Sequence, residues 1–134
     1  MMSYYDDLFE IASVIVKIKD ELFCLSIRNA VDINSYEFQN KLEELKVLVS
    51  REIAILSKMS IEDVELSFNK LRDSIRLNST IEFYDKLNSW EDLEGYLTSE
   101  FKKSDFISSN LDAFLRVFYR LKNQAFMLND GKIK

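Results

Sequence analysis

The chain has no proline and only two glycines in 134 residues, so almost nothing in it interrupts a helix. Proline costs about 3 kcal/mol inside a helix and glycine about 1 kcal/mol. The chain also lacks histidine, which is the commonest general acid or base and the commonest metal ligand. The composition therefore favours an all-α protein, and we predict no catalytic residue and no cofactor in it.

The charge and the hydrophobic content indicate the domain organisation and the kinds of partner of the protein. With 47% hydrophobic residues, the length and composition predict a single helical domain over residues 1–134. A net charge of −5 disfavours both nucleic acid and anionic membranes as partners. No apolar run is long enough to span a bilayer. The single cysteine, Cys24, fits a reducing compartment, so we expect a cytoplasmic protein.

Apolar residues recur at alternating steps of three and four along the first 25 residues or so, which predicts a long first helix. They are Leu8, Ile11, Ile15, Ile18, Leu22 and Leu25. A second apolar stripe lies beside the first and holds Tyr5, Phe9, Ala12, Val16 and Phe23. Because a helix that is apolar on two faces must be covered on both, this helix is either the centre of the domain or the seam of a homodimer.

Later helix starts are marked by a capping residue with an acid three positions on. These starts are Asn34, Ser60, Ser89 and Ser109. A short helix is also expected over 81–87. The predicted buried face of the second helix holds Leu42, Leu45, Val49, Ile53 and Leu56. Together these signals predict an antiparallel bundle of about six helices joined by short links.

Residues 79–100 are the most acidic segment, with six acids against the single base Lys86. Aromatic side chains rimmed by carboxylates are typical of protein-binding patches. We therefore predict a protein-binding patch for a partner with a basic surface, formed by Glu82, Asp85, Trp90, Glu91, Glu94 and Tyr96. The alternative is that these aromatic rings fill the core beneath two short helices.

The leading functional interpretation is a small acidic module that binds one protein partner. It would act by steric occlusion or escort, as inhibitors, immunity or antitoxin-like proteins, and secretion or phage accessory proteins do. A structural homodimer through the first helix is an alternative interpretation.

A second alternative is a metal-dependent enzyme. Two segments repeat one pattern, Ser60-Ile-Glu-Asp-Val-Glu65 and Ser89-Trp-Glu-Asp-Leu-Glu94. Carboxylates three residues apart share a helix face and can hold Mg²⁺. The spacing Glu62-x-x-Glu65, then Glu82-x-x-Asp85, resembles that of the all-α nucleoside triphosphate pyrophosphohydrolases of MazG type. This resemblance implies Mg²⁺ on the four acids. Acids in first turns also suit helix capping and the helix dipole.

Overall fold

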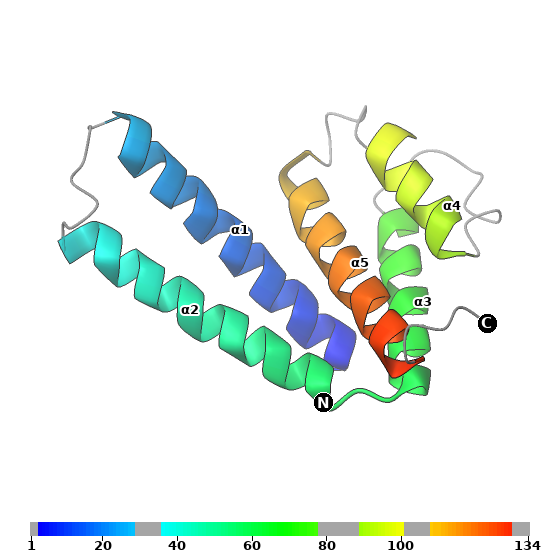
Figure 1. Ribbon diagram of the computed structural model, residues 1–134. Helices are drawn as coiled ribbons and strands as arrows, with labels where there is room; N and C mark the ends of the chain where they lie inside the picture. The colour runs from blue at the N-terminus through cyan, green and yellow to red at the C-terminus, as the bar shows by residue number, and fades with distance from the viewer. Residues whose placement is uncertain (1–2, 29–35, 78–88, 101–107, 130–134) are drawn as a thin grey trace.

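Figure 1 shows the computed structural model of the chain, which describes residues 3–28, 36–77, 89–100 and 108–129. Every element within these ranges is helical. The elements are α1 (Tyr4–Arg28), α2 (Tyr36–Ser57), α3 (Ile61–Leu77), α4 (Trp90–Gly95), the π-helical turn η2 (Tyr96–Glu100) and α5 (Ser108–Leu128). None of these helices is both long and apolar enough to cross a membrane.

The helices form an antiparallel arrangement around α1 and α5 (Figure 1). Helices α1 and α2 form a long hairpin, and α5 packs on α1 beside this hairpin. Helix α3 packs on α5, and α4 continues directly into η2 at the far side. The predicted all-α bundle with a long first helix is confirmed. The helix expected over 81–87 lies outside the described residues.

Three helices begin with a serine cap, at Ser3, Ser60 and Ser89. The Ser60 hydroxyl accepts from the Asp63 backbone N–H at 3.2 Å, and the Asp63 carboxylate accepts from the Ser60 N–H at 3.0 Å. Ser89 accepts from the Asp92 N–H at 3.1 Å. Ser3 makes the same reciprocal pair with Asp6 at the start of α1. The repeated Ser-x-x-Asp spacing in the sequence therefore acts as helix capping.

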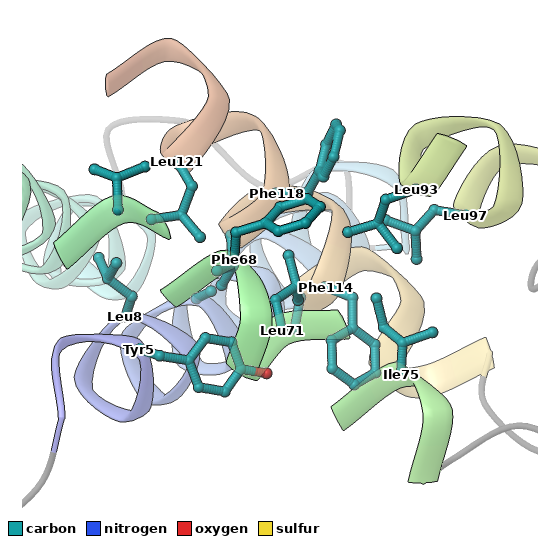
Figure 2. Close-up of a cluster of buried hydrophobic side chains, with 14 of the residues drawn as sticks. Tyr5, Leu8, Phe68, Leu71, Ile75, Leu93, Leu97, Phe114, Phe118 and Leu121 are labelled. Carbon is teal, nitrogen blue, oxygen red and sulfur yellow. The ribbon is translucent and has the colours of Figure 1, made fainter. Parts of the chain in front are cut away.

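The main core lies where α1, α3, α4, η2 and α5 meet, and its side chains converge in Figure 2. Aromatic rings connect the elements: Phe9 of α1 stacks on Phe114 of α5 at a centroid distance of 4.9 Å. Trp90 of α4 lies edge-to-face on Phe68 at 4.5 Å and on Phe118 at 5.6 Å. Through these contacts α4 is attached to both α3 and α5.

Helix α1 is the central helix of this arrangement. It packs on α2 along one side and on α5 along another. Its first stripe is buried from Leu8 to Ile18, and Ala12 of the second stripe is fully buried. Both apolar stripes of α1 are thus covered, in this half of the helix, by other parts of the same chain. The homodimer seam stays a prediction.

Tyr5 is a polar side chain placed in this core. It is 4% exposed, and its hydroxyl makes no hydrogen bond of ordinary geometry with the described residues. Burial raises the pKa of Tyr5 to about 12, although the Ser74 hydroxyl lies close enough to offset part of this effect. The folded state therefore favours the neutral phenol.

We expect Tyr5 to make the protein less stable in strong alkali, by roughly 2 to 3 kcal/mol. Because its pKa is higher in the folded than in the unfolded chain, its contribution is complete below about pH 10 and is lost as the pH rises towards about 12. Tyr5→Phe should remove this dependence and keep the stability at neutral pH, since no hydroxyl is then buried. Urea unfolding of both proteins at neutral and alkaline pH measures the difference, and an equal loss in both would contradict it.

Candidate functional site

The predicted patch on 79–100 is only partly a free surface. Trp90 is half-buried between Phe68 and Phe118, and Tyr96 is only 6% exposed and belongs to the core. Glu91 is exposed. Glu82 and Asp85 lie outside the described residues. The described part of the patch therefore offers Glu91 and the exposed part of Trp90 to a partner, whereas Tyr96 is buried.

Glu94, another residue of the predicted patch, is engaged inside the chain. Its carboxylate accepts from the Tyr119 hydroxyl at 2.7 Å and from Lys122 Nζ at 3.0 Å. These two bonds lower the pKa of Glu94, and the same carboxylate raises the pKa of Tyr119. Glu94 thus holds the α4 region against α5, and its negative charge already has a cation beside it.

The acids of the predicted metal site are exposed where the structure describes them. Glu62 lies in the first turn of α3 and Glu65 just after it, and both side chains are exposed. Their proposed partners, Glu82 and Asp85, fall outside the described residues. Among the residues that are described, no three Asp, Glu or Cys side chains lie close enough together to hold a metal ion.

A buried ion cluster joins α2 to α5, and sequence reasoning missed it. Glu52 is 1% exposed. Arg116 binds both of its oxygens, through Nε and Nη2, at 2.9 Å each. Arg120 Nε lies 2.9 Å from Oε1 of the same carboxylate. The expected burial of Ile53 is wrong, because the phase of α2 turns Glu52 inward to these arginines and leaves Ile53 exposed.

An open groove lies along the seam between α1 and α2. Two hollows of about 380 and 430 Å³ follow this seam. Val14 and Leu48 line both hollows, so the two are neighbours along the seam, and we call them together the hairpin groove. Its other lining residues are Asp7, Glu10, Ile11, Ile18, Asn40, Glu43, Glu44, Val47, Arg51, Ala54 and Ile55.

The hairpin groove opens on the side of the hairpin away from α5. Ala12 is fully buried in the core that α1 shares with α5. Val14 follows two residues later and so lies about 200° around the helix. On α2 the lining residues run from Asn40 to Ile55, a length of about 22 Å at the helical rise. The groove therefore runs along most of the hairpin.

The floor and the rim of the hairpin groove differ in chemistry. The floor is apolar, and Val14 and Val47 keep 40% and 56% of their surface exposed. Four carboxylates and one cation, Arg51, line the rim, and these acids are Asp7, Glu10, Glu43 and Glu44. Of the four, Glu43 is already paired with the exposed Lys46 at 3.3 Å. An apolar stripe between negative charges is complementary to an amphipathic helix with basic flanks.

No protein family, curated protein or solved structure matches the chain. The resemblance to the MazG-type pyrophosphohydrolases therefore rests on the spacing of Glu62, Glu65, Glu82 and Asp85 alone.

Proposed function

We propose that the chain is a small protein-binding module and that the hairpin groove is its docking surface. The observation that carries this proposal is the apolar, acid-rimmed floor left open between α1 and α2. Val47 is more than half exposed although it lies in the middle of a helix. A third helix laid along the seam would cover this floor and complete the packing of the hairpin.

The occupant we propose is an amphipathic helix of a protein partner with lysine or arginine on both sides of its apolar stripe. A groove of about 22 Å takes about 15 residues of helix. The partner's apolar side chains would contact Val14, Val47 and Leu48. Its basic side chains would pair with the rim carboxylates, which would set the orientation and speed association. While it is bound in the groove, the partner's helix cannot contact other molecules. The module would therefore act by steric occlusion or escort.

The proposal is tested with a labelled amphipathic peptide of leucine and lysine, about 15 residues long, by fluorescence anisotropy. We expect Val47→Asn to weaken binding about tenfold, because it removes most of the burial of one valine side chain. The matched control is Ile53→Asn on the same helix. Ile53 is similarly exposed, at 52% against 56%, but does not line the groove. Both variants keep the net charge.

Three results would contradict the proposal. The first is that Val47→Asn and Ile53→Asn weaken peptide binding equally. The second is equal binding of a peptide with glutamate in place of lysine, because the acidic rim should repel it. The third is a dimer without peptide that Val47→Asn converts to a monomer, which would assign the groove to a second copy of the chain.

A further inference from the structure

A separate hollow of about 310 Å³ lies between α3 and α4, on the other side of α5 from the hairpin. It is lined by Glu65, Phe68, Asn69, Ser89 and Trp90. It thus combines two aromatic rings, one carboxylate and one amide. Its size is at the lower end of ligand pockets, which suits a single small group.

The aromatic wall of this hollow is held in place by packing. Trp90 contacts Phe68 edge-to-face at 4.5 Å and Phe118 at 5.6 Å, so neighbours on two helices restrict its ring. The ring is only half-buried and lines the hollow. The same aromatic cluster already accommodates one cation, because Lys122 Nζ lies 6.0 Å from the centroid of Phe118. That ammonium is neutralised by Glu94 at 3.0 Å.

The charge at the mouth of the hollow comes from Glu65. This carboxylate is exposed and has no ion pair with any residue in the described ranges. The Asn69 side chain one turn later adds a carbonyl oxygen that can accept a hydrogen bond. A tryptophan ring with a carboxylate beside it can attract an organic cation.

We propose that this hollow binds an organic cation, namely a guanidinium or alkylammonium group. The cation would lie against Trp90 and pair with Glu65, while Asn69 would accept a hydrogen bond from its N–H. The site is independent of the hairpin groove, and the proposal stands whether or not that groove binds a helix.

Trp90 is the single tryptophan of the chain, so its fluorescence reports on the hollow directly. The probe is ethylguanidinium chloride, with sodium chloride at equal ionic strength as the reference and circular dichroism to confirm that the chain stays folded. We expect a saturable change in emission with the probe only. Glu65→Gln should weaken the binding of ethylguanidinium about fivefold, which corresponds to the loss of a partly exposed ion pair. Glu62→Gln, on the same helix but not lining the hollow, should leave it unchanged.

A second arm of the experiment distinguishes a free cation from the side chain of a protein. A short peptide with one arginine is compared with its citrulline twin and with ethylguanidinium. Tighter binding of the arginine peptide identifies a protein side chain as the ligand, and equal binding identifies a small free cation. A response that is linear, that sodium chloride or magnesium chloride reproduces, or that survives Glu65→Gln unchanged would overturn the proposal.

Discussion

Replacing Glu52 with glutamine is expected to lower the free energy of unfolding by about 3 to 5 kcal/mol. The Glu52 carboxylate is buried, and Arg116 and Arg120 both bind it at 2.9 Å. Removing its charge leaves two arginine side chains, both partly withdrawn from water, without their counter-ion. Because this cluster links α2 to α5, the loss should also loosen the hairpin against the rest of the fold.

Urea unfolding followed by circular dichroism measures this loss. The control is Glu43→Gln on the same helix. The Glu43 carboxylate lies 3.3 Å from Lys46 Nζ, and both side chains are exposed. Exposed pairs contribute little, so this variant should change the stability by less than about 1 kcal/mol. Replacing all three charged residues together by Leu or Met should recover most of the loss. Equal, small effects of Glu52→Gln and Glu43→Gln would show that the cluster does not hold α2 to α5.

Phe118→Ala is expected to lower the free energy of unfolding by about 3 to 5 kcal/mol, as the removal of a buried phenylalanine usually does. Phe118 is 0% exposed and contacts Trp90 at 5.6 Å and Tyr119 at 5.0 Å. Its loss opens a cavity where α3, α4 and α5 meet, so the emission of Trp90 should shift to longer wavelength. Chemical denaturation measures the stability, and fluorescence measures the shift.

The matched control for Phe118→Ala is Phe126→Ala, eight residues later on the same helix. Phe126 is 52% exposed, so its removal should change the free energy of unfolding by less than about 1 kcal/mol. Similar losses for the two variants would mean that the core is not organised around Phe118 in the way described.

Much of the fold could be predicted from local signals. Helix formation follows from the absence of proline, and the serine caps at Ser60 and Ser89 are set by residues three positions apart. The long first helix carries its apolar stripes in its own periodicity. Such features depend on neighbours within one or two turns, and the sequence contains them in full.

The placement of individual side chains around a helix could not be predicted as well. Ile53 fits the apolar stripe of α2 in the sequence, yet Glu52 takes the buried position because Arg116 and Arg120 lie 64 and 68 positions away in the chain. The sequence does place Glu52 on the apolar face of α2, because Glu52 follows Val49 by three residues and precedes Leu56 by four.

The hairpin groove also depends on tertiary packing. Val14 and Val47 lie on different helices, and nothing in either helix alone shows that their side chains border one hollow. The aromatic residues Trp90 and Tyr96 illustrate the converse. Their clustering with acids is visible in the sequence, but Trp90 is half-buried through its contacts with Phe68 and Phe118, and Tyr96 is buried as part of the tertiary core.

The most direct test of the hairpin groove is quantitative capture of protein from the native cells with three baits: the wild-type chain, Val47→Asn and Ile53→Asn. Our account predicts one stoichiometric partner that the wild type and Ile53→Asn retain equally and that Val47→Asn loses. That partner should contain an amphipathic helix flanked by lysine or arginine. A partner retained equally by all three baits, or no partner at all, would contradict the assignment of the groove.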